Sequence, residues 1–336
     1  MKVAVLGATG LVGSEMLKVL EERAFRAAEI LPLASPRSAG RRVRFSGVDL
    51  SVQAVCEKSF DGVDIALFSA GAETSRIWAP VAAAAGAVVI DNSSAWRMDP
   101  DVPLIVPEVN PEDARWHTGI IANPNCATIQ AVTALKPLHD AAGLEALRVV
   151  TFQSVSGTGK KGLDALMEGT EAVLQGRVPC AGPYPRPIAF DVLPEIGDIG
   201  PDGISGEERK MILESRKILH LPELVVNCTA VRVPVFRGHA EAVTAVFRES
   251  LDPSEACRLL GNAPGVYCCD EFERKGYATC REAAGTDDVY VGRVRREGGD
   301  PKELSFWVVA DNLRKGAALN AVQIAEILEP VLRGMK

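Results

Sequence analysis

The stretch VAVLGATGLVG, residues 3–13, places a short apolar run directly before a glycine-rich turn and a helical pattern. Residues 3–6 are apolar, as in a buried strand, and Met16, Leu17 and Leu20 follow with helical spacing. Glycines between a strand and a helix let the backbone approach a pyrophosphate, which then faces the helix N-terminus. The spacing is G-x-x-G-x-x-G rather than the commoner G-x-G-x-x-G, so a purely structural glycine turn is the alternative. The order of strand, glycine turn and helix favours a dinucleotide-binding loop.

The alternation of strands and helices continues and predicts an α/β fold. Strand-like runs at 29–35, 64–68, 88–90 and 120–122 flank an alanine-rich helical pattern at 73–85. A chain of 336 residues is too long for one small core, so we expect two domains. We also expect a strand at 147–152, an amphipathic helix from 206 to about 219, and a C-terminal helix that packs back on the first domain.

Composition excludes several classes of function. The net charge of −7 argues against nucleic acid as the main partner, because phosphate backbones require a basic face. Apolar runs are interrupted too often for a membrane span, and the N-terminus does not resemble a signal peptide, so we expect a cytoplasmic protein. The eight cysteines form no C-x-x-C pair. They are expected to be reduced thiols, and no metal site is predicted.

One cysteine is placed for chemistry. Cys126 follows the apolar run 120–122 and the turn Asn123-Pro124-Asn125, and it precedes a helical pattern at 127–135. The first turn of a helix has unpaired N–H groups and a positive dipole end, which favour a thiolate nucleophile. The alternative is an inert core cysteine.

Basic residues follow two of the predicted strands. The second strand ends in Ser35-Pro36-Arg37-Ser38, where an NAD enzyme would carry an acidic residue for the ribose hydroxyls. Arg37 beside Ser38 suits a 2′-phosphate, so NADP is favoured over NAD; a solvated basic loop is the alternative. Arg97 follows the strand at 88–90, and it is either an anion ligand or an exposed surface arginine.

The second half of the chain contributes further candidates. Residues 153–161 form a polar glycine loop, which is either a ligand contact or a connector. Glu207 and Lys210 share one face of the predicted helix, as an ordinary surface ion pair does. A hairpin could bring Arg232 and His239 to one sheet edge, and His239 is the best placed of the four histidines for proton transfer. The segment 176–205 has six prolines and little periodicity, which indicates a subunit contact.

Blocks spread over nearly the whole chain resemble aspartate-semialdehyde dehydrogenase. They are GATGLVG at 7–13, SPRS at 35–38, DNSSAWR at 91–97, NPNC at 123–126, QSVSG at 153–157, EERK at 207–210, RVP through His239 at 232–239, and DNLRKGAA at 311–318. The resemblance covers neither the segment 176–205 nor the turn near 297–301.

The resemblance implies NADPH-dependent reductive dephosphorylation of 4-phospho-L-aspartate to L-aspartate 4-semialdehyde. In that reaction Cys126 forms a thioacyl intermediate and His239 is the acid/base. The resemblance further implies that Gln153 and Asn125 assist at the acyl group, and that substrate and phosphate are bound by Arg232, Glu207, Arg97 and Lys210. It implies a cofactor site made of Gly7, Thr9, Gly10, Leu11, Val12, Arg37, Ser38, Ser156, Gly157 and Asn312.

The implied architecture is an N-terminal Rossmann-like doubly wound sheet (1–124), an α+β catalytic and dimerisation domain with a mixed sheet (125–310), and a returning C-terminal helix (311–336). The implied assembly is a homodimer or a dimer of dimers. The implied pathways are those of lysine (through diaminopimelate), threonine, methionine and isoleucine. The alternatives are another acyl-phosphate reductase, such as N-acetyl-glutamyl-phosphate reductase, a glyceraldehyde-phosphate dehydrogenase, and a non-catalytic relative.

Overall fold

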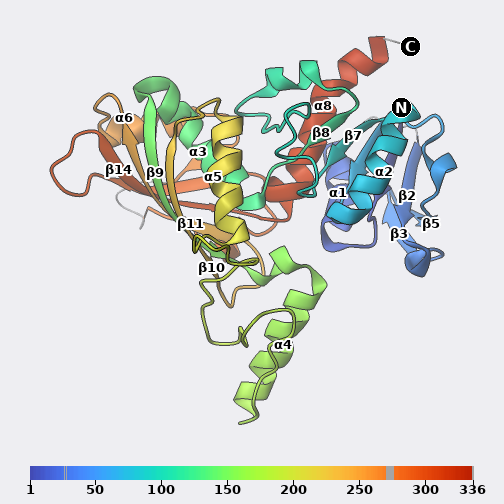
Figure 1. Cartoon of the computed structure of the whole chain (residues 1–336), viewed down its shortest axis with the longest axis horizontal. Helices are drawn as coiled ribbons and strands as arrows, with labels where there is room; N and C mark the ends of the chain where they lie inside the picture. The colour runs from blue at the N-terminus through green and yellow to red at the C-terminus, as the bar shows by residue number, and fades with distance from the viewer. Residues whose placement is uncertain (26, 28, 270–275, 335–336) are drawn as a thin grey trace. The chain divides into compact units, whose positions relative to one another are not determined.

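The computed structural model describes residues 1–25, 27, 29–269 and 276–334. Its chain forms two compact units, one of residues 1–125 with 317–336 and one of residues 126–316 (Figure 1). The domain boundaries expected at 124 and 310 stay a prediction. Residues 311–316 are counted with the second unit, and the return to the first unit begins at Ala317.

The first unit is built on a parallel sheet. Its order is β5 (Gln53–Ala54), β2 (Glu29–Ala34), β1 (Lys2–Leu6), β6 (Ile65–Phe68), β7 (Val88–Asp91) and β8 (Ile120–Ala122). Every neighbouring pair in this sheet is parallel. The strand order reverses between β1 and β6, which is where doubly wound sheets bind ligands. The predicted Rossmann-like sheet is confirmed.

Both faces of this sheet carry apolar side chains, so helices pack against them. Helix α1 (Leu11–Glu22) and helix α8 (Leu319–Gly334) share one core with Val3, Val5 and Ile65. Helix α2 (Ala72–Ala84) packs on β7. A small antiparallel sheet of β3 (Arg42–Phe45) and β4 (Val48–Ser51) completes the unit. Helix α8 thus belongs to the first unit although it lies at the end of the chain.

The second unit is built on a mixed sheet, as expected. Its order is β10 (Val225–Arg232), β9 (Leu144–Gln153), β11 (His239–Phe247), β14 (Glu303–Ala310), β13 (Val289–Arg295) and β12 (Val266–Cys268). Pairs β9–β10 and β12–β13 are parallel, and the other pairs are antiparallel.

Three helices pack on one face of that sheet, and a fourth stands apart. They are α3 (Cys126–Ala142), α5 (Gly206–Ile218) and α6 (Pro253–Gly261), which contact β9, β10 and β13 respectively. Helix α4 (Lys160–Leu174) projects away from the rest of this unit (Figure 1). A short helix, α7 (Cys280–Ala283), packs on β14.

The structure corrects two local predictions. The strands of Arg232 and His239 do not form a hairpin, because β9 lies between them and pairs with both. The helical pattern predicted at 127–135 extends to Ala142 in α3, with Pro137 inside the helix. The flanking residues Leu135 and Leu138 are both 0% exposed, so their packing outweighs the hydrogen bond that proline removes. Within the part of the chain that the structure describes, no helix is both long and apolar enough to cross a bilayer.

Candidate active site

Three polar side chains lie level with one another at one end of the second sheet. Gln153 ends β9 and Arg232 ends the parallel strand β10, where the two are register partners. His239 begins the antiparallel strand β11 and is the register partner of Gln153 on the other side. All three are buried. The central strand β9 therefore brings together two residues that a hairpin was expected to join.

The two ring nitrogens of His239 have different surroundings. Nδ1 accepts a hydrogen bond from the backbone N–H of Ser154 at 3.1 Å, and the Ser154 hydroxyl oxygen is also 3.1 Å from Nδ1. Because a backbone N–H can only donate, Nδ1 is unprotonated and the proton of the neutral ring is assigned to Nε2. Nε2 has no hydrogen-bond partner among the described residues. The ring thus presents an unused N–H donor.

The charge state of His239 follows from its burial. Its side chain is 0% exposed. Burial, reinforced by the positive charge of Arg232, lowers the pKa of His239 to about 3. The backbone at Gly238 and the carboxylate of Glu207 oppose this shift without reversing it. At neutral pH the ring is therefore an uncharged hydrogen-bond donor.

The neighbouring Arg232 is fixed from two sides. Its Nη1 donates to the carbonyl oxygen of Ser154 at 2.8 Å, and its guanidinium carbon lies 5.9 Å from the centre of the Tyr184 ring. Gly157 lies close by: a Cβ there would be 3.0 Å from Arg232 Nη1 and 3.5 Å from His239 Nε2. A side chain at position 157 would therefore crowd both the cation and the N–H donor.

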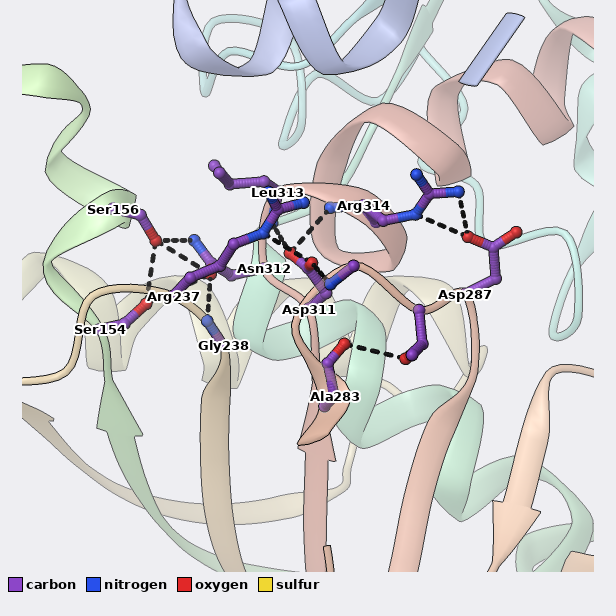
Figure 2. Close-up of polar contacts among 12 residues, drawn as sticks. Ser154, Ser156, Arg237, Gly238, Ala283, Asp287, Asp311, Asn312, Leu313 and Arg314 are labelled. Atoms are coloured by element: carbon purple, nitrogen blue, oxygen red, sulfur yellow. Dashed lines mark hydrogen bonds and ion pairs between the residues drawn. The ribbon is translucent and has the colours of Figure 1, made fainter. Parts of the chain in front are cut away.

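Asn312 ties the surrounding loops together. Its Oδ1 accepts hydrogen bonds from Ser154 Oγ (3.2 Å), Ser156 Oγ (3.1 Å) and the backbone N–H of Gly238 (2.9 Å). Figure 2 shows Asn312 between these residues, which come from the end of β9, the 3₁₀ turn Val155–Thr158 and the turn before β11. Asn312 was predicted as a cofactor contact, and that role stays a prediction. In the structure its amide holds the loop of Ser156 against the turn that precedes His239.

The segment after Asn312 reaches Cys126. Asp311 is fully buried; it accepts hydrogen bonds from Arg237 Nε (2.7 Å) and the backbone N–H of Gly285 (2.6 Å), which anchors the segment (Figure 2). A π-helix over Arg314–Ala318 follows. A Cβ at Gly316 would lie only 2.9 Å from Cys126 Cβ, so this position requires glycine. Cys126 is half-buried and is the first residue of α3, as the sequence predicts.

The predicted pair Glu207 and Lys210 lies on the first turn of α5. A capping box made by Ser205 and Glu208 starts this helix. Lys210 Nζ donates to Glu207 Oε2 at 2.9 Å, so the two form the ion pair expected from their spacing. Glu207 is only 7% exposed, and its carboxylate acts on the pKa of His239. Glu207 therefore belongs to the surroundings of the buried imidazole, while the Lys210 side chain is partly exposed.

In the first unit, the glycines of residues 7–13 shape a tight turn between β1 and α1. A Cβ at Gly7 would lie 2.4 Å from the carbonyl oxygen of Ser69, and one at Gly13 would lie 2.1 Å from that of Gly7. Gly10 is the N-cap of α1 and offers no side-chain hydrogen bond to the first N–H groups of the helix. The other predicted residues of this turn are Thr9, which precedes Gly10, and Leu11 and Val12, which open α1. Gly7 and Gly13 are therefore required by the close packing of this turn against neighbouring backbone.

Arg37 and Ser38 lie in a 3₁₀ turn, Pro36–Ser38, directly after β2. Arg37 is exposed and Ser38 is half-buried. Arg97 differs from the exposed alternative, since it is 8% exposed. It donates through Nε to the carbonyl oxygen of Asn123 (3.0 Å) and through Nη2 to that of Asn92 (2.7 Å). Asn125 is 6% exposed and is the last residue of this part of the first unit.

Sequence reasoning missed the partner that orients the imidazole. Ser154 contacts Nδ1 of His239 although the two residues are 85 positions apart. The signal would have been the register of β9 with β11, which periodicity within one strand does not reveal. The anchoring role of Asp311 was missed for the same reason, because its partners Arg237 and Gly285 come from distant loops.

Comparisons with known proteins agree with this architecture. The chain matches a family described as "Semialdehyde dehydrogenase, NAD binding domain" over residues 2–117. It matches "Semialdehyde dehydrogenase, dimerisation domain" over residues 135–315. It is 52% identical to an aspartate-semialdehyde dehydrogenase of Aquifex aeolicus over 97% of each chain, and 46% identical to that of Bacillus subtilis over 97% of each.

Solved structures show the same likeness. The crystal structure of aspartate semialdehyde dehydrogenase II from Vibrio cholerae complexed with ASA superposes with a TM-score of 0.95, at 48% identity over 98% of each chain. The Candida albicans aspartate semialdehyde dehydrogenase with NADP gives a TM-score of 0.74, at 25% identity over 98% of each chain. The chain therefore belongs to the aspartate-semialdehyde dehydrogenase family.

Proposed function

We propose that the protein catalyses the reversible, NADPH-dependent conversion of 4-phospho-L-aspartate to L-aspartate 4-semialdehyde and phosphate. The observation that carries the proposal is the row of Arg232, Gln153 and His239, in which a buried cation lies beside an unused N–H donor. Such a row can bind a substrate carboxylate and stabilise an oxyanion. Family membership supplies the nucleophile, Cys126, at the N-terminus of α3.

The first step is acyl transfer to sulfur. The thiolate of Cys126 attacks the acyl carbon and a C–S bond forms. The bond between the acyl carbon and the bridging phosphate oxygen breaks, and its electron pair leaves with phosphate. The N-terminal end of α3 favours the negative charge on the sulfur before attack. Arg97 and Lys210 would balance the charge of the departing phosphate.

The second step needs a proton at the former carbonyl oxygen. As the thioester is reduced, that oxygen takes an electron pair, and Nε2–H of His239 donates the proton, which leaves the ring as an imidazolate until the proton returns. Collapse of the resulting thiohemiacetal returns this proton to Nε2, breaks the C–S bond and restores the thiolate. The hydrogen bond from Ser154 to Nδ1 supports the assignment, because it keeps the mobile proton on Nε2.

The other polar residues would bind and orient the substrate. Arg232 would hold the α-carboxylate, since a guanidinium matches the two oxygens of a carboxylate. Gln153 and Glu207 would orient the amino acid part, and Asn125 would help to place the acyl oxygen. These roles rest on family likeness and on the burial of these side chains.

The residues of the first unit fit a dinucleotide. The tight glycine turn and the uncapped N-terminus of α1 would hold the pyrophosphate, through Gly7, Thr9, Gly10, Leu11 and Val12. Arg37 and Ser38 would bind the 2′-phosphate of NADP. Bound NADPH supplies the hydride that reduces the thioester. Ser156, Gly157 and Asn312 would line the nicotinamide end.

Assembly, location and pathway are also part of the proposal. The match to a dimerisation domain supports a homodimer or a dimer of dimers built through the second unit. The product would feed the synthesis of lysine through diaminopimelate, and of threonine, methionine and isoleucine, in the cytoplasm. The partners would be small molecules only.

A direct assay tests the proposed reaction. L-aspartate 4-semialdehyde should reduce NADP⁺ in a manner that requires inorganic phosphate, and this is measured by the absorbance of NADPH. Arsenate should replace phosphate, because both anions can attack the thioester. No reduction with this aldehyde, together with reduction by N-acetyl-glutamate semialdehyde or glyceraldehyde 3-phosphate, would refute the substrate assignment.

The preference for NADP is tested at Arg37. Arg37→Ala should raise KM for NADP by about 10- to 100-fold, the range expected for one lost charge-assisted contact, and change KM for NAD little. Arg41→Ala is the matched control, because Arg41 is an exposed arginine of the same loop. Equal losses for both dinucleotides, or the same effect in the control, would contradict the assignment.

A further inference from the structure

A carboxyl group with no part in the proposed reaction is buried beside the proton donor. Glu241 lies two residues after His239 on β11, so both side chains point to the same face of the sheet. Its register partner on β9 is Thr151, two residues before Gln153. Glu241 is 0% exposed, and neither of its carboxyl oxygens has a hydrogen-bond partner among the described residues. A buried polar group of this kind is costly, so its presence requires an explanation.

A second buried polar group lies against it from the helix of the nucleophile. Gln130 is one turn after Cys126 on α3, and this helix packs on β9 and β11. Gln130 is also 0% exposed, and both polar atoms of its amide likewise have no partner within the described residues. The amide is close enough to the carboxyl of Glu241 to affect its protonation. Two unsatisfied buried groups thus face each other across the contact between α3 and β11.

We propose that Glu241 is a positioning residue that couples, through Gln130, the helix carrying Cys126 to the strand carrying His239. The inference rests on the proposed function, in which these two residues act on the same substrate carbon. A carboxylic acid and a primary amide each offer a donor and an acceptor side by side, so they can pair through two hydrogen bonds. Such a pair links α3 to β11 within one helical turn of Cys126 and two residues of His239.

The pairing requires the neutral acid. Burial raises the pKa of Glu241 well above its usual value, and the Gln130 amide opposes this rise only in part. The nearby titratable or charged groups on the same sheet face are His239, which is neutral, Cys228, whose thiol pKa is raised by burial and by Glu241, and the cation Arg232. Arg232 carries a positive charge, but it lies level with His239 rather than with Glu241, and burial still raises the pKa of the carboxyl. A Glu241→Gln variant should therefore keep the proposed pairing, because its amide also offers one donor and one acceptor to Gln130.

Kinetics of paired variants test the coupling. Glu241→Met should lower kcat by about tenfold with little change in KM, because misplaced reacting groups slow chemistry more than binding. Glu241→Gln should stay within about threefold of wild type. Gln130→Met should match Glu241→Met, and the double variant should be no worse than either single one. Val243→Ala, two residues further along the same face of β11, is the control for lost packing and should lower thermal stability without lowering kcat.

The dependence of stability on pH tests the protonation state. A carboxyl whose native pKa is raised makes the protein less stable as the pH rises above the unfolded pKa of that group, because the native state then binds more protons than the unfolded chain. The unfolding temperature of Glu241→Gln minus that of wild type should therefore increase from pH 5 to pH 8. His239 is present in both proteins and cancels in the difference. This measurement needs no activity.

The outcomes separate this inference from the proposed function. It is overturned if Glu241→Gln is as slow as Glu241→Met, if the two methionine variants add independently, or if the pH-dependent difference is absent. Should Glu241→Met not fold, Gln130→Met alone must show the loss of kcat. If instead wild type does not act on L-aspartate 4-semialdehyde, the proposed function fails, and the pH-dependent stability and a double-mutant cycle in unfolding free energy still test the coupling.

Discussion

Replacing Cys126 by alanine is expected to lower kcat for reduction of NADP⁺ by L-aspartate 4-semialdehyde by about 10⁴-fold or more, the scale seen when an enzyme loses its nucleophile. Without the sulfur no hemithioacetal forms, so there is no carbon from which a hydride can be taken. The loss should appear in kcat, while affinity for NADP in an equilibrium titration stays unchanged. Steady-state absorbance and fluorescence titration measure the two quantities.

The control is Cys180→Ala, which removes an exposed cysteine of the second unit and should leave kcat unchanged. Because Gly316 packs directly against Cys126, serine is the closest steric match at this position. Cys126→Ser should be as inactive as the alanine variant but should keep the wild-type unfolding temperature. Substantial turnover in Cys126→Ser would show that the reaction does not pass through this residue.

His239→Ala should lower kcat by about 10²- to 10⁴-fold, the usual contribution of a positioned acid or base. His239→Gln should retain more activity, because its amide can place an N–H near the position of Nε2. The ring is neutral in the free enzyme at neutral pH, with a pKa of about 3. The pH profile of kcat/KM for wild type should accordingly show no ionisation of His239 near pH 6.5. An ionisation near pH 6.5 that is present in wild type and absent in His239→Gln would contradict the buried, neutral ring.

The burial of His239 should also make the free energy of unfolding depend on pH in a defined direction. The unfolded ring has a pKa near 6.5 and the native ring one of about 3, so the unfolded chain binds more protons between these values. Stability is then fully present above about pH 6.5 and is lost as the pH falls, by on the order of 2 kcal/mol at pH 5 relative to a variant without the histidine. Urea unfolding of wild type and His239→Gln at pH 8 and pH 5 measures this difference.

The sequence predicted the elements that depend on local patterns, but it did not predict the pairing of strands that are far apart in the chain. The glycine turn, the parallel strands and the helix start at Cys126 each follow from a pattern within about twenty residues, and the structure has all three. The order of the second sheet could not be read in this way. A strand, a turn and a returning strand predicted a hairpin, but β9 lies between β10 and β11 because its parallel pairing with β10 spans about 80 residues of chain.

The same limit applies to the candidate site. Arg232 and His239 could be chosen from their types and neighbours, whereas Ser154 and Glu241 could not. Ser154 orients the imidazole only through the register of β9 with β11, and Glu241 appears in the sequence as an ordinary polar residue within a strand. Its complete burial depends on the packing of α3 against that strand, which is a property of the folded second unit.

The covalent intermediate on Cys126 is the central claim, and trapping it is the most direct test. Enzyme mixed with L-aspartate 4-semialdehyde and NADP⁺ without phosphate should form one equivalent of NADPH in a burst and then stop, because no anion is present to release the acyl group. Acid quenching and peptide mass spectrometry should find an aspartyl thioester on Cys126, and added phosphate should discharge it. A stoichiometric burst with the acyl group on another residue, or NADPH formation with no acylated protein, would contradict the account.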